Sequence, residues 1–542
     1  MGRVLAIWLD GFDVGLADTW GLEALCGLVP QSAHAVLDPG LSYRTGLAGE
    51  HLSTGLDPAA SGRASAVHFD PATYSCEQRG TTFRPVLGDL PSVVLDPCYF
   101  DLAAARPNVL GLTDWGAHDP GSVATARPAG LEGEVNQRFG PSGRRWTYAT
   151  PWASISDCEQ MGVDLAAAVR RRTEIASWLL GERLPDWQIA MIGVAEAHSA
   201  TEGLFHGVDP SPRWQSCPSR PAAEHALRSV YEAIDELVGK LTSQFADSVQ
   251  VVFALHGMGA NSSDVPSMLL LGELLSRWSG HPTPDLNFPL GPDGIPFLPP
   301  GVLWGDVAAT GLGSTPSRRG KALGAAPSPV RRIVRRVRAG RSGSTLPPGS
   351  SRLNWMPLMR HQAKWSTMRA FALPSFYDGR VRVNLCGREA LGCVALDDYQ
   401  AVLDEVEETL GACRDPLLEI PVVKSFERPF EDPMSAGSSD ADLIITWADG
   451  VLGIGHPDLG TIGPVPPRRT GGHAPVGRCL VRGAGIDPVD LGLRSSFDVL
   501  PTVLRLADGT ASWELSGQPM PVSVGQQDEP LGHAPQRDRA PA

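Results

Sequence analysis

The chain has 542 residues, of which 42% are hydrophobic and 20% are charged, the ordinary composition of a soluble globular protein. Its 46 basic and 60 acidic residues give a formal net charge of −14, which argues against a nucleic-acid polymer as the main partner. No apolar run approaches the roughly 18 residues that a membrane-spanning helix needs. We therefore expect neither nucleic acid nor a membrane as partner.

The cysteines and the first apolar segment bear on the compartment. Nine cysteines are scattered without C-x-x-C pairs, and their number is odd, which favours free thiols in a reducing cytoplasm. The first apolar segment is short and ends at an acidic residue, unlike a secretory signal. We expect a cytoplasmic protein, and the sequence leaves its oligomeric state open.

The first stretch, "RVLAIWLDGFD", organises the rest of the chain. Residues 4–9 form an apolar run rich in branched side chains, which is typical of a strand buried on both faces. The run stops at Asp10, with Gly11 behind it. Because ligands of open α/β sheets bind beyond the carboxyl ends of the strands, Asp10 is a candidate site residue.

A threonine precedes a short helical pattern further along. Thr45 stands before "GLAGEHL", which can form a helical turn that starts at Gly46. A hydroxyl in this place would face free backbone N–H groups at a helix start, a natural position for a phosphate. On the local pattern alone, an ordinary N-cap threonine is favoured.

A long helix and a second buried strand follow. Ser156 and Glu159 form a capping box that predicts the start of a helix running through "MGVDLAAAVRRRTEIASWLLG". The next apolar run, residues 189–195, predicts a buried strand.

The densest group of ligand-type residues comes at the end of this strand: Glu196, His198, Glu202 and His206. His198 and Glu202 are spaced i and i+4, so they fall on one face of a helical turn, and this spacing can chelate a metal. A polar loop with a solvated Glu and a hydrogen-bonded His explains the local sequence equally well.

A second helix and a third strand complete a repeating pattern. "RPAAEHALRSVYEAIDELVGKLTSQ" is amphipathic and leads into "SVQVVFALHGMGAN", a buried strand that ends at His256. Strands with polar ends alternating with helices predict an α/β fold with a mostly parallel central sheet and helices on both faces. We expect one catalytic domain over residues 1–522, with irregular insertions near the site.

The later chain is less regular. Residues 280–351 are rich in Pro and Gly, which indicates an insertion. The basic stretch at 331–341 within this insertion is either a lid or rim that attracts anions or a solvated surface segment, and the charge pattern favours the solvated segment. Asp378-Gly379 predicts a hairpin. His473 stands in a Gly-rich loop before another predicted strand, and the polar tail at 523–542 is expected to be disordered.

Several of these residues follow strands or lie in Gly-rich loops: Asp10, His198, Glu202, His256 and His473. Carboxylate and imidazole ligands suit zinc or manganese, and a mixed set near one hydroxyl indicates metal-assisted phosphoryl or sulfuryl transfer. One metal would lower the pKa of the Thr45 hydroxyl, and another would stabilise the leaving group.

Four short motifs occur in a familiar order: "STGLDP" from Ser53, "ALHGMG" from Ala254, "NLCGREALG" from Asn384 and "GGHAPVGR" from Gly471. With the early Asp-Gly, this order resembles the type I phosphodiesterase/nucleotide pyrophosphatase branch of the alkaline phosphatase superfamily. Within that branch it is most similar to the predicted phosphohydrolase/phosphomutase group. The resemblance runs, with gaps, from about Arg3 to Pro519.

The resemblance implies an alkaline phosphatase-like fold and assigns roles. It makes Thr45 the nucleophile, nine residues before the Thr-Gly of "STGLDP". It has Asp10 and His256 hold one metal and His473 help to hold another.

The sequence departs from the family pattern in two places. Leu255 replaces the family's Asp before the His of "DHGM", and Leu cannot coordinate a metal. His198 and Glu202 stand where the family has D-x-x-x-H, which swaps the two ligand types at the same spacing. Glu196 is a possible compensating ligand, with His206 and Gly46 as further site residues.

The resemblance therefore implies a metal-dependent hydrolase of phosphate mono- or diesters that forms a phospho-Thr45 intermediate. It would act on a small phosphorylated substrate with one or two divalent ions, zinc or manganese. Phosphomutase chemistry is a close neighbour, whereas a formylglycine sulfatase is disfavoured because the nucleophile position holds neither Cys nor Ser. The alternative is a metal-poor pseudoenzyme, favoured by Leu255, that binds a phosphorylated ligand or a partner protein.

Overall fold

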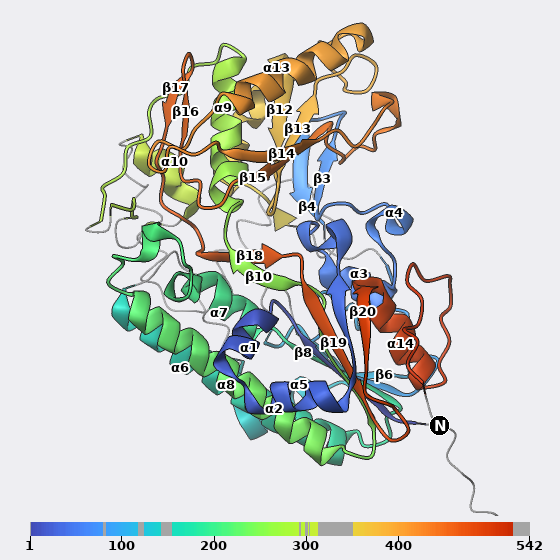
Figure 1. The fold of residues 1–542 in the computed structure, drawn as a ribbon. Helices are drawn as coiled ribbons and strands as arrows, with labels where there is room; N and C mark the ends of the chain where they lie inside the picture. The colour runs from blue at the N-terminus through green and yellow to red at the C-terminus, as the bar shows by residue number, and fades with distance from the viewer. Residues whose placement is uncertain are drawn as a thin grey trace, which may run out of the picture.

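The computed structural model describes residues 2–79, 83–116, 124–142, 154–291, 294–298, 302, 304–312 and 351–523. Two lobes are visible in Figure 1. The large lobe is built around a nine-stranded sheet, and the small lobe around a four-stranded sheet. Residues 313–350, which include the predicted basic stretch, lie outside the described residues, as do residues 524–542 of the predicted tail.

The nine-stranded sheet confirms the predicted fold class. Its strands, in spatial order, are β20 (Val489–Ser495), β2 (Ala33–Asp38), β19 (Gly477–Arg482), β9 (Val249–Ala254), β1 (Val4–Leu9), β8 (Ile189–Val194), β5 (Ser92–Leu95), β6 (Val109–Thr113) and β7 (Thr125–Arg127). Pairing is parallel from β9 through β6 and between β2 and β20, whereas β19 and β7 run antiparallel to their neighbours.

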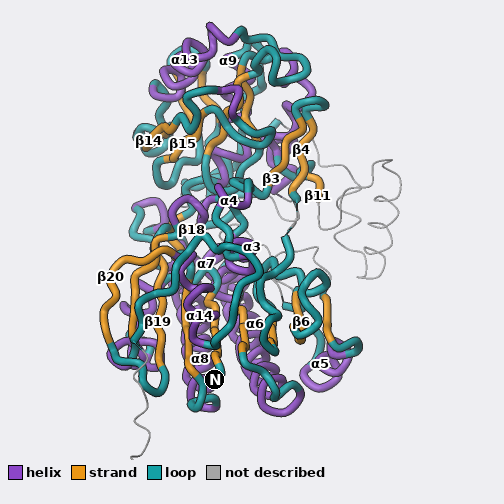
Figure 2. The backbone as a smooth tube through the Cα atoms, turned by 90° about the vertical axis from the view of Figure 1, so that its right-hand side faces the viewer, coloured by secondary structure: helices purple, strands orange, loops and turns teal. Residues whose placement is uncertain are grey.

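The helices of the large lobe lie on both faces of this sheet (Figures 1 and 2). They are α1 (Val14–Trp20), α2 (Glu23–Leu28), α3 (Ala48–Thr54), α5 (Leu131–Phe139), α6 (Ile155–Trp178), α7 (Glu196–Leu204), α8 (Arg220–Gln244) and α14 (Val499–Leu506). The short helix α4 (Pro58–Ser61) lies between the two lobes (Figures 1 and 2).

The alternation of side chains along β1 explains why both faces are covered. Leu5, Ile7 and Leu9 belong to the apolar cluster that contains the inner faces of α6 and α8. The intervening residues, Val4, Ala6 and Trp8, belong to a second cluster on the opposite face, with α14. All six side chains are buried, as a continuous apolar run predicts for a central strand.

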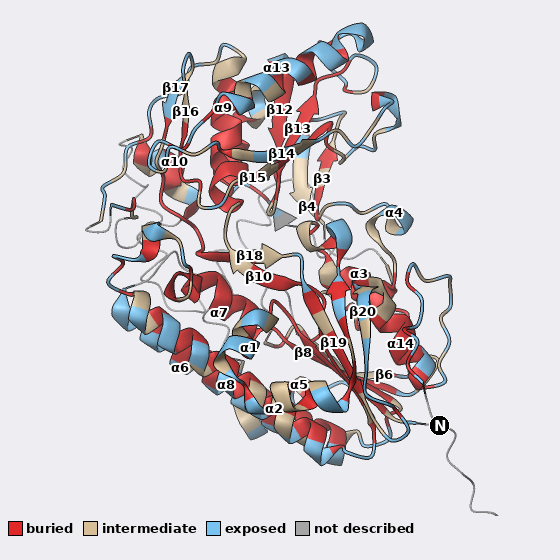
Figure 3. Cartoon of the chain, viewed as in Figure 1, coloured by how far each residue is buried: buried red, intermediate tan, exposed pale blue. Residues whose placement is uncertain are grey.

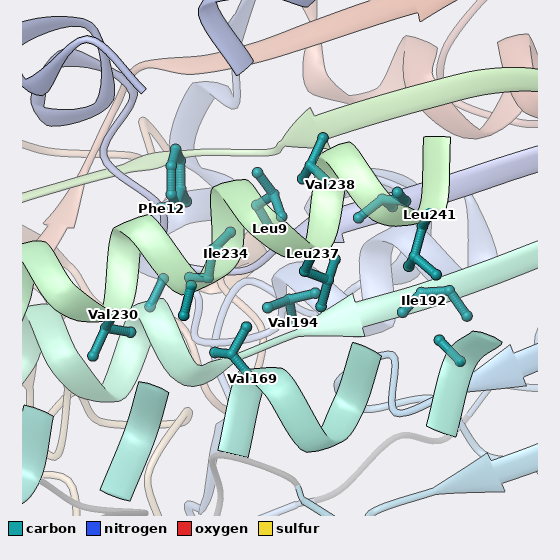
Figure 4. Packing of buried hydrophobic residues seen from close by; sticks show 14 of the residues in the cluster. Leu9, Phe12, Val169, Ile192, Val194, Val230, Ile234, Leu237, Val238 and Leu241 are labelled. Carbon is teal, nitrogen blue, oxygen red and sulfur yellow. The ribbon is translucent and has the colours of Figure 1, made fainter. Parts of the chain in front are cut away.

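The α6–α8 layer forms the thickest part of the core. Figure 4 shows side chains of α8, including Ile234 and Leu237, next to Val169 of α6 and Val194 of β8. The outward faces of the same helices are largely exposed (Figure 3). The amphipathic pattern therefore predicted the buried face of α8 correctly.

The register of the sheet brings polar residues together. Leu9 of β1 pairs with Val194 of β8, and Trp8 pairs with Phe253 of β9. The three strands consequently end at one edge of the sheet, and the residues that follow them meet there.

The small lobe has its own apolar core. Its sheet consists of β12 (Ala370–Leu373), β13 (Gly379–Val383), β15 (Leu443–Trp447) and β14 (Val423–Glu427), all antiparallel. Its helices include α9 (Leu271–Trp278), α10 (Val307–Gly311), α13 (Tyr399–Gly411) and the 3₁₀ segment η9 (Pro357–Thr367). The hairpin predicted at Asp378-Gly379 is confirmed, since β12 and β13 pair antiparallel across this turn.

Three small sheets complete the fold: β10 (Gly257–Ala260) with β18 (Gly471–Ala474), β3 (Val67–Asp70) with β4 (Ser75–Gln78) and β11 (Ser351–Arg352), and β16 (Ile454–His456) with β17 (Gly460–Ile462). The β10–β18 pair lies between the two lobes (Figures 1 and 2).

Some local predictions require correction. The cap of α6 is Ser154, whose Oγ accepts from the Asp157 N–H, so the capping box predicted at Ser156 is wrong by two residues. After β1 the chain forms two short helices, α1 and α2, because Gly21 adopts a left-handed conformation between them. The division into one domain at residues 1–522 stays a prediction.

The nine cysteines all lie within the described residues, and each is a free thiol, as predicted. None of the described helices is long and apolar enough to cross a membrane.

Candidate active site

A pocket lies at the edge where β1, β8 and β9 end. Four of the predicted ligands line it: Asp10, His198, His256 and His473. Its other lining residues include Gly46, Cys98, Tyr377, Arg468 and Arg469. The pocket thus combines a carboxylate, three imidazoles and two guanidinium groups.

Asp10 is held firmly at the end of β1. Its backbone N–H donates to the Val194 carbonyl at 3.0 Å, which continues the pairing with β8. Its Oδ2 lies 3.0 Å from His198 Nδ1 and 3.4 Å from Cys98 Sγ. Since a carboxylate only accepts, His198 donates from Nδ1. Gly11 (φ +59°) permits this contact, because a Cβ there would lie 2.7 Å from His198 Cβ.

His473 and His256 are oriented by backbone carbonyls. His473 Nδ1 lies 2.7 Å from the Tyr43 carbonyl, and His256 Nδ1 lies 3.0 Å from the Gly257 carbonyl, so both donate. The two rings stack with centroids 4.2 Å apart. In the neutral form each ring then carries its lone pair on Nε2, the usual arrangement in a metal-binding histidine.

The surroundings favour this neutral form. Burial, together with the neighbouring His256 and His198, holds the pKa of His473 well below its usual value. Burial also lowers the pKa of His256, although the charge of Asp10 opposes that shift. Both imidazoles are therefore unprotonated near neutral pH and able to act as ligands.

The contact between His198 and His473 supports a cation site. Their Nε2 atoms lie 3.1 Å apart. Because both rings already donate from Nδ1, two lone pairs would face each other unless a proton or a cation lies between them. Two nitrogens bound to one tetrahedral zinc are separated by roughly 3.3 Å. Glu202 Oε1 lies 3.4 Å from His198 Nε2, a similar spacing.

The donor chemistry of these residues suits a divalent cation, but both carboxylates already have partners within the chain. Glu202 is completely buried and forms an ion pair with Arg469. Asp10 is bonded to His198. Among the described residues, no three His, Cys, Asp or Glu side chains surround one point as in a formed metal centre.

Leu255 stands where the resemblance implies a carboxylate ligand of the metal that Asp10 and His256 would hold. Its side chain is 5% exposed and belongs to the apolar cluster with Leu500 of α14. It lines a smaller cavity next to His51 and Phe497, and this cavity shares Ala48 and His256 with the lining of the main pocket. The end of β9 is therefore built for apolar packing at this position.

Thr45 lies beside the pocket, and its hydroxyl is hydrogen-bonded to neighbouring groups of the chain. Oγ1 accepts from the Leu47 N–H at 3.0 Å, and its single proton has two acceptors, the Ser42 carbonyl at 2.8 Å and His51 Nε2 at 3.3 Å. Thr45 caps the 3₁₀ segment η2 (Gly40–Arg44) at its C-terminal end, so it is not the N-cap of α3. Its neighbour Gly46 lines the pocket.

Besides Thr45 and Glu202, two further predicted residues do not line the pocket, Glu196 and His206. The Glu196 carboxylate makes a bidentate ion pair with buried Arg172, so its charge is already compensated. His206 contacts Ser219 and Thr470 through its ring nitrogens, at 3.1 and 3.5 Å. Both are buried and hold α7 in place.

Sequence reasoning missed three residues of the site: Tyr377, Arg468 and Arg469. Tyr377 stacks on His473 with ring centroids 4.1 Å apart. The two arginines immediately precede "TGGH", and a pair of cations next to a ligand histidine was the signal that could have identified them.

The comparisons with known proteins found only distant similarity, to solved structures. No protein-family profile matches the chain, and no curated protein matches it. Among solved structures, it is similar to a phosphonoacetate hydrolase from Sinorhizobium meliloti 1021 in complex with phosphonoformate, at 15% identity and a TM-score of 0.45 over 93% of this chain and 96% of that one. It is also similar to murine ectonucleotide pyrophosphatase/phosphodiesterase 5 in complex with AMP, at 10% identity and a TM-score of 0.43 over 96% and 98%. Because these values are low, function is inferred below from the side chains of the pocket.

Proposed function

We propose that the chain is a hydrolase of small phosphate mono- or diesters, with Thr45 as nucleophile and one divalent cation, zinc or manganese. The observation that carries this proposal is the pocket in which a carboxylate and three imidazoles face two arginines at the carboxyl edge of the sheet. Guanidinium groups recognise phosphoryl oxygens, and carboxylate–imidazole sets hold the cations that assist phosphoryl transfer.

The two arginines give the pocket its preference for an anion. Arg468 and Arg469 both line it, and each is under one-tenth exposed. In such a site a charge-assisted hydrogen bond to a phosphoryl oxygen is stronger than in water, because the local dielectric is low. Substrate binding is therefore assigned to this pair.

The Thr45 hydroxyl is prepared by its neighbours. The Leu47 N–H already donates to Oγ1, and the same donor would stabilise negative charge on this oxygen during attack. His51 donates from Nδ1 to the Leu56 carbonyl at 2.8 Å, so its Nε2 carries a lone pair that can hold the hydroxyl proton. Attack requires the hydroxyl to leave the Ser42 carbonyl and turn toward the pocket.

The bond changes follow from this arrangement. Thr45 Oγ1 forms a bond to phosphorus as the bond to the leaving alcohol breaks, and water then hydrolyses the phospho-Thr45 ester. Asp10, His198, His256 and His473 are the residues that would hold the cation. When bound, such a cation lowers the pKa of a hydroxyl and neutralises phosphoryl charge.

A phosphate-binding protein without catalysis is the second candidate. Leu255 and the Arg469–Glu202 ion pair favour it, because each removes a ligand from a two-cation site. Binding by Arg468 and Arg469 would persist without any turnover.

The first test is release of nitrophenol from nitrophenyl phosphate and from bis(nitrophenyl) phosphate. We expect turnover that chelation abolishes and added zinc or manganese restores. Thr45→Ala should reduce the rate about a thousandfold or more, because it removes the nucleophile, whereas the control Thr45→Ser keeps a hydroxyl and measurable activity. Full activity of Thr45→Ala would refute the mechanism. Saturable phosphate binding without hydrolysis by the wild type would support the binding protein.

A further inference from the structure

A thiol, Cys98, lines the same pocket as Asp10 and His256. Cys98 Sγ lies 3.4 Å from Asp10 Oδ2, and because a carboxylate only accepts, the thiol hydrogen lies between these two atoms. Sulfur and oxygen ligands of one tetrahedral zinc are separated by roughly 3.5 Å, since their bonds to the metal are roughly 2.3 and 2.1 Å long. Replacement of this hydrogen by a metal ion therefore requires little change in the distance between the two atoms.

The fold holds Cys98 at the edge of the sheet where Asp10 lies. Cys98 comes three residues after the end of β5, and Leu95 of that strand pairs with Ile192 of β8. The backbone of Cys98 packs closely on α3, because a Cβ at Gly49 would lie 2.1 Å from the Cys98 carbonyl oxygen. The thiol consequently reaches Asp10 from a backbone that is held in place by its neighbours.

A buried imidazole in the same pocket gives independent support for a metal ion there. His256 is 2% exposed, and its Nδ1 donates to the Gly257 carbonyl. Its Nε2 has no hydrogen-bond partner among the residues that the structure describes. Burial lowers the pKa of His256 and the charge of Asp10 opposes this shift, so the two groups lie within electrostatic reach of each other. A carboxylate, a thiol and an imidazole with a lone pair are donors that suit zinc.

We propose that Cys98 is a sulfur ligand of the cation that Asp10 and His256 would hold, in place of the carboxylate ligand that Leu255 replaces. When the metal ion binds, the Cys98 S–H bond breaks, its proton passes to water, and the sulfur donates an electron pair to the metal. Thiolate ligands favour zinc, whereas manganese prefers oxygen ligands. The site therefore selects zinc. This inference rests on the proposed function only for the presence of the cation.

Cobalt spectroscopy tests the proposal without any activity measurement. The protein is freed of metal with a chelator, dialysed, and titrated with Co²⁺, which reports on its ligands by absorbing light. For the wild type we expect a sulfur-to-cobalt charge-transfer band in the near ultraviolet. Cys98→Ser should lose this band, although its hydroxyl still allows a hydrogen bond to Asp10. The matched control is Cys26→Ser, which alters another partly buried thiol, on α2, and should keep the band.

Alkylation of the wild type is a second measurement, and it decides the question if Cys98→Ser folds poorly. Peptide mass spectrometry follows the reaction of each thiol with iodoacetamide, with and without zinc. Zinc should slow the alkylation of Cys98 by about tenfold or more, because the metal engages the electron pair that attacks the reagent. Cys26 in the same sample should react at an unchanged rate.

Several outcomes overturn the proposal. They are a wild type that binds no Co²⁺, a Co²⁺-loaded wild type without the band, a band that persists in Cys98→Ser, and alkylation of Cys98 that zinc does not slow. These results are distinct from the fate of the proposed function. The band and the protection of Cys98 without any hydrolysis would support this inference and reject the hydrolase, whereas metal-dependent hydrolysis without the band would do the reverse.

Discussion

At the scale of single residues, the site shows how local contacts replace ligands that the family pattern would supply. Leu255 joins the apolar cluster under α14, and Glu202 is neutralised by Arg469. Asp10 nevertheless keeps an imidazole partner, His198, at 3.0 Å. Both the Glu202 and the Asp10 carboxylates are therefore already paired with side chains of the chain itself.

His206 supplies a prediction about pH. Burial lowers its pKa to about 4, whereas an unfolded chain binds the same proton near pH 6.5. The unfolded state therefore holds more protons between these values, and the free energy of unfolding should fall as pH is lowered. From about pH 7 to about pH 5 this group contributes a loss of about 2 kcal/mol.

Urea unfolding with a chelator present measures this effect. His206→Gln cannot titrate, so its free energy of unfolding should fall by about 2 kcal/mol less than that of the wild type over the same range. Exposed His225 on α8 provides the control, because His225→Gln makes the same substitution at an exposed position. Identical pH profiles for the wild type and His206→Gln would contradict this assignment.

At the scale of elements, buried charge ties α6, β5 and α7 together. Arg172 of α6 is 1% exposed and donates to Glu196 at the start of α7 and to Asp96 after β5. Asp96 also accepts from the backbone N–H groups of Trp115 and Gly116. Arg172→Met leaves two buried carboxylates without their cation, and it should lower the free energy of unfolding by about 3–5 kcal/mol.

Arg170→Met is the matched control for this substitution. Arg170 lies on the same helix, but its side chain is 57% exposed and its ion pair with Glu236 faces solvent. Its loss should change stability by about 1 kcal/mol or less. If both variants unfold at the same denaturant concentration, the buried network does not carry the stability assigned to it.

The elements were largely predictable because their patterns are local. The apolar run at residues 4–9 indicates a strand, and the amphipathic repeat of α8 indicates a helix, without reference to any distant part of the chain. Both elements were predicted with correct bounds. The N-cap of α6 was predicted two residues too late because Ser154 and Ser156 are both good cap residues, and only the backbone conformation decides which of them caps the helix.

The candidate site was predictable where it follows from strand ends. Asp10 follows β1 directly and His256 follows β9 after one residue, so parallel register alone places them at one edge. Arg469 was not predictable in this way, because its partners Glu202 and Asp264 lie in distant parts of the chain. The orientation of the Thr45 hydroxyl depends equally on tertiary contacts with His51.

At the scale of the whole molecule, both lobes contribute to the pocket. Tyr377 comes from the loop between β12 and β13 of the small lobe, and its ring stacks on His473 of β18 at 4.1 Å. Tyr377→Ala removes this contact and should lower kcat/KM by about tenfold, the upper range for one aromatic pair. Tyr377→Phe keeps the ring and should retain nearly full activity. Equal activity of Tyr377→Ala and the wild type would show that the small lobe does not position His473.

The central claim is that phosphoryl transfer passes through Thr45. Its most direct test is acid quenching of the enzyme during turnover of nitrophenyl phosphate, followed by peptide mass spectrometry. We predict one phosphoryl group on the peptide that contains Thr45, present in the wild type and absent from Thr45→Ala. Steady hydrolysis with no phosphoryl group on this peptide, or with the group on another residue, would contradict the account.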